Sequence, residues 1–146
     1  MNKELIERLL YKEEKNEVLK VIDEIKDEIT LFVFAYNYNW DNGFEIPSKI
    51  LENKNCTLSV ALLLFYSADG LNYLMDKRAN DNLPNWSEFI EILYKKIIGN
   101  KFMTGTVAYE IPLTKIQLFK LQAYISGPVS SPRRMVPCNG MVTSTL

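Results

Sequence analysis

The stretch Phe32–Pro47, which reads FVFAYNYNWDNGFEIP, decides between a helical and a β interpretation of the chain. An aromatic ring stands at every second position from Phe32 to Trp40, as on one face of a β-strand. The same stretch also continues a helical spacing of three and four residues from the segment before it. We favour a helix that ends near Asn37, because tertiary packing often overrides the β propensity of aromatic residues.

The segment before this stretch, from Asn2 to Ile29, is predicted to be one amphipathic helix. Its apolar residues Val18, Ile22, Ile25 and Ile29 are spaced by four, three and four positions, with Glu and Lys between them. The aromatic residues that follow continue this apolar stripe at helical intervals. This continuity supports the helical interpretation of the next stretch.

A tight turn is predicted at Asp41-Asn42-Gly43, because Gly accepts positive φ and Asp or Asn can bond the nearby backbone. Gly70 is placed to end or interrupt a strongly apolar helix, and residues 79–84 have the composition of a loop. The helices expected after the turn are Pro47–Asn53, Leu58–Ala68 with Thr57 as N-cap, a helix capped by Asn85 or Ser87 and ended by Gly99, and Thr114–Tyr124.

The predicted fold is mainly α: a single compact multi-helix domain with at most a short extended segment near residues 102–111. One domain is expected from a length of 146 residues. We place the helical domain at residues 1–126 and an irregular, disordered tail at residues 127–146. The tail holds three of the six prolines and no acidic residue, whereas all 18 acidic residues occur earlier. A frame change near the end of the coding sequence would produce the same shift in composition.

The chain has no histidine, which excludes Ser-His-Asp and Cys-His catalysis and every His-ligated metal site. The first residues carry acids where a signal peptide is basic, and apolar runs such as Leu31–Tyr36 are far shorter than the roughly 20 residues that span a bilayer. We therefore expect a cytoplasmic protein with no membrane partner.

Nucleic acid is not an expected partner either. The 17 basic and 18 acidic side chains leave a net charge of -1. The aromatic row resembles a base-stacking platform, but no Lys or Arg occurs between Ile29 and Ser48 to hold phosphates. A dense aromatic patch of this kind is more typical of a core or of a protein-binding surface.

Four residues around the turn are the candidate binding residues: Trp40, Asp41, Glu45 and Asp69. Their carboxylates would serve as an acid and base pair if they converged. The oxygen atoms of Asp41, Asn42 and Glu45 are also ligands that hard cations prefer, but the sixth position from Asp41 lacks the glycine of the common calcium loop. Turn and cap roles are the simpler interpretation, so we assign no metal, no cofactor and no catalytic residue.

Cys56 is the one thiol next to a predicted helix N-terminus, a position that can activate a cysteine. Because the chain offers no histidine as a base, we interpret Cys56 as a small buried core residue. Cys138 lies 82 residues further on, and this spacing fits no zinc or redox motif.

Five short motifs follow one another in this chain: Tyr38–Pro47 (YNWDNGFEIP), Ile50–Asn53 (ILEN), Cys56–Leu58 (CTL), Ala61–Leu62 (AL) and Phe65–Gly70 (FYSADG). Taken in this order, they resemble the domain of unknown function 4274 family of small bacterial proteins. The resemblance covers residues 30–100 and implies a compact, mostly helical domain, without an established activity. The sequence departs from the family pattern at Asn42 and Thr57, where the family often has an acid, and this further weakens a metal site. The residues on motif positions are Trp40, Asp41, Gly43, Pro47, Cys56, Ala61, Asp69 and Gly70.

We expect a non-enzymatic protein-interaction domain of the immunity or accessory type, whose partner is another bacterial protein. The aromatic residues and the lack of any cofactor motif favour this function. One alternative is a carboxylate-dependent enzyme, or a domain that binds a sugar or another small ligand, centred on the turn Trp40–Gly43. A further alternative is a structural subunit that forms a homo-oligomer through an apolar face.

Overall fold

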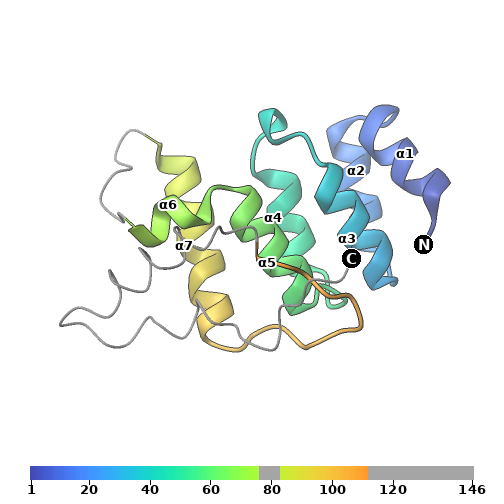
Figure 1. Ribbon diagram of the computed structural model, residues 1–146. Helices are drawn as coiled ribbons and strands as arrows, with labels where there is room; N and C mark the ends of the chain where they lie inside the picture. Colours follow the sequence, from blue (N-terminus) through green and yellow to red (C-terminus); the bar gives the residue numbers. More distant parts are fainter. Residues whose placement is uncertain (76–82, 112–146) are drawn as a thin grey trace.

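The computed structural model describes residues 1–75 and 83–111. Within these ranges it contains seven α-helices, one 3-10 helix and no β-strand (Figure 1), so the mainly α fold class is confirmed. In chain order the elements are α1 (Lys3–Tyr11), α2 (Lys15–Ile22), α3 (Glu28–Asn37), the 3-10 helix η1 (Trp40–Asn42), α4 (Glu45–Glu52), α5 (Leu58–Ser67), α6 (Gly70–Met75) and α7 (Pro84–Ile98).

Helix α5 lies at the centre of the molecule. It packs against α3 on one side and α7 on another, while α1 packs on α3, α2 packs on α4, and α6 packs on α5. Figure 1 shows α1 to α3 towards one end, α6 and α7 at the other, and α4 and α5 between them. The sequence explains this position, because all residues from Ser59 to Phe65 are buried and leave the helix no polar face.

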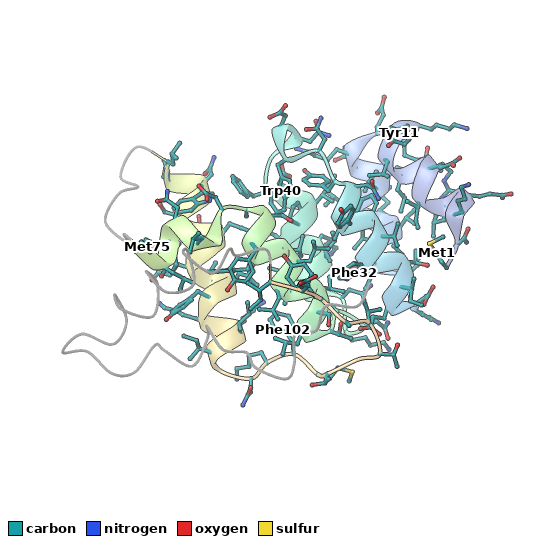
Figure 2. All side chains as sticks on the ribbon, in the orientation of Figure 1. Met1, Tyr11, Phe32, Trp40, Met75 and Phe102 are labelled. Atoms are coloured by element: carbon teal, nitrogen blue, oxygen red, sulfur yellow. The ribbon has the colours of Figure 1, made fainter. Side chains whose placement is uncertain are left out.

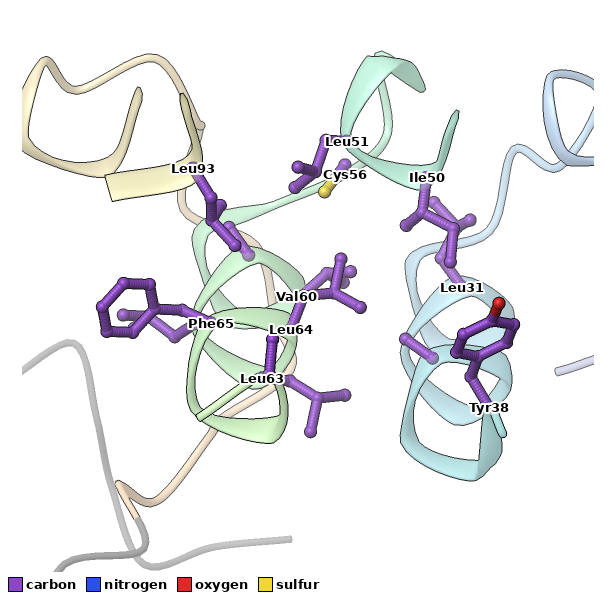
Figure 3. Close-up of a cluster of buried hydrophobic side chains, with 14 of the residues drawn as sticks. Leu31, Tyr38, Ile50, Leu51, Cys56, Val60, Leu63, Leu64, Phe65 and Leu93 are labelled. Carbon is purple, nitrogen blue, oxygen red and sulfur yellow. The ribbon is translucent and has the colours of Figure 1, made fainter. Parts of the chain in front are cut away.

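The core is built from side chains that α5 shares with its neighbours. Figure 3 shows α5 between Leu31 of α3 and Leu93 of α7, both of which are fully buried. Cys56 lies in the same cluster and is buried, as predicted from the sequence. Burial raises the pKa of its thiol to about 12, so it is a protonated, unreactive core residue at neutral pH.

The helical interpretation of the aromatic row is confirmed, because α3 ends at Asn37. The prediction of one long helix from Asn2 to Ile29 is wrong, since this segment forms α1, α2 and the first residues of α3. The first break follows α1, where the N–H groups of Lys12 and Glu13 both donate to the carbonyl oxygen of Arg8.

The second break, between α2 and α3, depends on a residue from another helix end. The Asn53 side-chain amide donates to the carbonyl oxygens of Ile22 and Ile25, at 2.7 and 2.9 Å. These bonds satisfy carbonyl groups that a continuous helix would have used. Asp27 then caps α3, because its carboxylate accepts from the N–H of Ile29 at 3.2 Å. The hydroxyl of Thr30 donates to the same carboxylate and is the main reason that the pKa of Asp27 is lowered.

Three predicted helix signals act differently from the expectation. Thr57 precedes α5, but its hydroxyl donates to Glu28 at 2.6 Å and does not cap the helix. Helix α7 begins at Pro84, whose missing N–H and fixed φ suit a first position, so the predicted caps Asn85 and Ser87 lie inside the helix. Gly70 begins α6, and the residue with positive φ at this junction is Asp69.

The segment near residues 102–111 runs as extended chain without forming a strand within the described part of it. Two hydrogen bonds join it to the start of α5. The N–H of Leu58 donates to the carbonyl oxygen of Met103, and the hydroxyl of Ser59 donates to the carbonyl oxygen of Val107. Most of the predicted loop at residues 79–84 lies outside the described residues. The same is true of the whole predicted helix Thr114–Tyr124, of Cys138 and of the predicted tail at residues 127–146. Among the helices that are described, none has the length and apolar composition needed to cross a membrane.

Candidate functional site

The turn between α3 and α4 is held by bonds within itself. Asn39 accepts from the N–H of Asp41 at 3.0 Å and so caps η1, while the N–H of Gly43 donates to the carbonyl oxygen of Trp40 at 3.1 Å. Gly43 has φ of +94°, a conformation that other residues rarely adopt. The Tyr38 hydroxyl donates to the Gly43 carbonyl oxygen at 2.8 Å and closes the loop. The predicted tight turn is therefore confirmed.

Trp40 is a half-buried packing residue of this turn. Its ring centroid lies 5.4 Å from that of Tyr38, 6.0 Å from that of Phe44 and 5.9 Å from that of Phe89. Edge-to-face and tilted contacts at these distances stabilise aromatic clusters. Trp40 therefore connects the turn to α7.

The three predicted carboxylates belong to different parts of the fold. Asp41 is exposed on η1, and Glu45, at the start of α4, forms an ion pair with Lys15 at 2.9 Å. Asp69 is exposed at the junction of α5 and α6, away from the turn in the chain order. Within residues 1–75 and 83–111, no three acidic or thiol side chains are placed to hold a metal ion. Of the four predicted binding residues, Trp40 and Asp41 are neighbours, and Glu45 lies one short loop away.

A cavity of about 370 Å³ lies beside the turn, between the facing ends of α1, α2 and α3. Its floor is apolar and is formed by the side chains of Leu9, Val18, Phe34 and Ile46, all of which are buried. We call this space the turn cavity. Figure 2 labels Tyr11, which lines it at the outer margin of the molecule, and Trp40 of the neighbouring turn, which lies further inside.

The rim of the turn cavity is polar. Three amide side chains, those of Asn37, Asn39 and Asn42, are exposed there, together with the Tyr11 ring. The turn thus borders a cavity, but through residues other than Trp40 and Asp41. The signal in the sequence for this rim is the repeated asparagines of Asn37-Tyr-Asn-Trp-Asp-Asn42, among which only Asn42 is predicted to take part in the turn.

A second hollow, of about 610 Å³, lies along the outer side of α3. One wall comes from α3, and the other comes from the extended residues Thr106, Val107 and Ala108. Ile29 and Tyr36 are 43% and 67% exposed there. We call this hollow the α3 groove, and it is lined on the α3 side by Ile29, Phe32, Val33 and Tyr36.

Glu28, the first residue of α3, holds the extended wall of the α3 groove in place. One of its carboxylate oxygens accepts from the N–H of Thr106 at 2.9 Å and from its hydroxyl at 3.1 Å, while the N–H of Val107 lies 3.3 Å away. The other oxygen accepts from the Thr57 hydroxyl. A Cβ added to Gly105 would overlap this carboxylate, so any other residue there would force the Glu28 side chain to shift.

The described helices form a small all-α domain that has the aromatic turn and these two hollows on its surface. The chain belongs to the domain of unknown function 4274 family, whose model matches residues 26–98, half of the 146 residues. The resemblance to this family is thereby confirmed, and the match runs from α3 to α7. No curated protein matches the chain, and no solved structure matches it.

Proposed function

We propose that this protein is a non-enzymatic interaction domain that binds another bacterial protein through the α3 groove. The observation that supports it is the exposure of Ile29 and Tyr36 on a helix whose other apolar residues are mostly buried. Contiguous exposed apolar side chains are typical of protein-binding surfaces. An immunity-type or accessory role in the cytoplasm is the finer form of the proposal, because a protein that blocks a partner needs a docking surface and no catalytic centre.

The chemistry of the groove favours a partner segment with apolar or aromatic side chains. Every described residue that lines it is uncharged. The carboxylate of Glu28, which holds the extended wall in place without lining the groove, is already bonded to Thr57, Thr106 and Val107. A charged ligand would find no counter-charge there, whereas an apolar segment would cover Ile29 and Tyr36.

The alternative centred on the turn has less support in its carboxylate form. An acid and base pair requires two carboxyl groups that face one space. Glu45 is bound to Lys15, and Asp69 lies at the junction of two other helices. The homo-oligomer alternative makes a separate prediction, because a second copy would then occupy the α3 groove.

The test compares two substitutions of equally exposed isoleucines. Ile29→Glu changes the α3 groove, and Ile98→Glu changes the end of α7, where the exposed fraction is 42% against 43% for Ile29. Each immobilised protein is used to capture partners from a lysate of the source bacterium, and affinity for the purified partner is then measured by calorimetry. We expect Ile29→Glu to weaken binding by at least about tenfold, because a buried charge replaces a buried apolar contact.

Three results would contradict the proposal. Equal affinity of the Ile29→Glu and Ile98→Glu variants would place the interface elsewhere. If no protein is captured above the control level, the proposed partner protein does not exist in the lysate. A dimer mass in light scattering that becomes a monomer mass only in Ile29→Glu would assign the groove to a second copy of the chain.

A further inference from the structure

The turn cavity has an apolar floor, a polar rim and a volume of about 370 Å³, which is within the range of small-molecule sites. It is separate from the α3 groove, since its lining residues come from α1, α2, the end of α3, η1 and α4. Phe34 and Ile46 of the floor are buried, whereas Tyr11 at the mouth is 76% exposed. A ligand that fits must therefore offer both apolar and polar surface.

The charged side chains at the rim are already neutralised within the chain. Glu13 lies 3.2 Å from the Nε atom of Arg8, and Lys15 lies 2.9 Å from the Oε1 atom of Glu45. A charged ligand would have to compete with one of these ion pairs. The rim is thus suited to a ligand without net charge.

The three amides provide both kinds of hydrogen-bonding atom. Asn37 donates from Nδ2 to the carbonyl oxygen of Val33 at 2.9 Å, which leaves its Oδ1 atom as an acceptor towards solvent. Asn39 accepts at Oδ1 from Asp41, which leaves its Nδ2 hydrogens as donors. Among the described residues, no partner is found for the amide of Asn42. A hydroxyl group, which both donates and accepts, is the complement of such a rim.

We propose that the turn cavity binds a small neutral polyhydroxylated ligand, a mono- or disaccharide. The hydroxyl groups of the sugar bond to Asn37, Asn39 and Asn42, and its apolar C–H face lies against the Tyr11 ring. This site does not depend on a partner protein at the α3 groove, so either proposal can fail without the other.

The test is an NMR titration of the full chain with neutral mono- and disaccharides up to about 10 mM, a concentration that detects millimolar dissociation constants. A uronic acid and an amino sugar serve as charged analogues. We expect shifts confined to the end of α1 and residues 37–43. The double variant Asn37→Ala/Asn42→Ala should raise the dissociation constant by at least about tenfold, because two hydrogen-bonding partners are lost.

The matched control is Asn72→Ala, an exposed amide on α6 outside the cavity. It should bind sugar as the unmodified chain does. Tyr11→Ala is a second variant that removes only the exposed ring and should also weaken binding. The proposal is overturned if no neutral sugar causes shifts, if the shifts lie outside the cavity, if the charged analogues bind more tightly, or if Asn72→Ala loses as much affinity as the double variant.

Discussion

Asp69 and Gly70 occupy the junction of α5 and α6 for different reasons. Asp69 has φ of +65°, in the left-handed region that costs most residues energy and that Asp tolerates better than most. Gly70 is needed for space, because a Cβ there would lie 2.2 Å from the ring of Phe65. The positive φ therefore gives Asp69 a role in the backbone turn that does not require its carboxylate.

This role predicts the effect of two substitutions at Asp69. Asp69→Gly should raise the free energy of unfolding by up to about 1 kcal/mol, because glycine adopts positive φ without the steric cost. Asp69→Val should lower it by about 1–2 kcal/mol, because a branched side chain is strained there. Urea unfolding measures both values. A loss of more than about 1 kcal/mol in Asp69→Gly would show instead that the carboxylate contributes to stability.

Helix α3 serves three surfaces of the molecule at once. Its buried residues Leu31 and Phe34 belong to the core, Tyr36 reaches the α3 groove, and Asn37 reaches the turn cavity. The position of the helix relative to the extended segment depends on Glu28, whose carboxylate is bonded to residues 78 and 79 positions away. The N-terminus of α3 is therefore the point at which the groove is assembled.

Glu28→Ala is expected to lower the free energy of unfolding by about 2 kcal/mol, because hydrogen bonds to a charged group are stronger than neutral ones and their donors would be left unpaired. Glu24→Ala, which removes an exposed carboxylate between α2 and α3, is the control and should change stability by less than about 0.5 kcal/mol. Chemical denaturation measures both variants.

Gly105 provides a second test of the same contact. Gly105→Ala should destabilise the protein by about 1–3 kcal/mol, because its Cβ would overlap the Glu28 carboxylate. In the Glu28→Ala background, the destabilisation caused by Gly105→Ala should be smaller by about 1 kcal/mol or more, because the overlapping carboxylate is absent. Additive effects in this double-mutant cycle would mean that the two residues do not meet in solution.

At the scale of the whole molecule, several tyrosines are packed into the core with their hydroxyl groups. Burial raises the pKa of Tyr38 and that of Tyr94 to about 12, and burial also raises the pKa of Tyr109 and of Tyr73. The Glu45 carboxylate adds to the effect at Tyr38. The folded protein thus favours the neutral form of these residues.

The consequence is a loss of stability at alkaline pH. An unfolded tyrosine titrates near 10, so between about pH 10 and pH 12 the folded state binds more protons than the unfolded state. The stability that these pKa shifts contribute is present below pH 10 and is lost as pH rises through 12. Tyrosinate absorbance and urea unfolding, measured across this range, check the prediction, with the denatured protein as the reference. Native tyrosines that all titrate near 10 would contradict it.

The positions of several helices could be predicted because their signals are local. The helical spacing up to Asn37, the apolar run of α5 and the end of α7 at Gly99 all come from residues close together in the chain. The break between α2 and α3 could not be predicted in this way. It depends on Asn53, which lies 31 positions from Ile22 in the sequence.

The candidate sites show the same division. Sequence drew attention to the turn through Trp40 and Asp41, whereas the structure uses the neighbouring Asn37, Asn39 and Asn42 to border the turn cavity. The α3 groove was not predicted, because Tyr36 belongs to the same aromatic row as the buried Phe34 and Tyr38. Periodicity identifies which residues share a helix face, but it does not identify which face remains uncovered.

The sequence by itself determined that the chain is helical, that it has a turn after Trp40 and that it contains no histidine for catalysis. These properties follow from local spacing, backbone preference and composition. Only the tertiary structure decided where the helices break, which carboxylates are paired and which aromatic residues stay exposed. The physical reason is that these features depend on contacts between distant residues, such as Glu28 with Thr106, for which the chain carries no local signal.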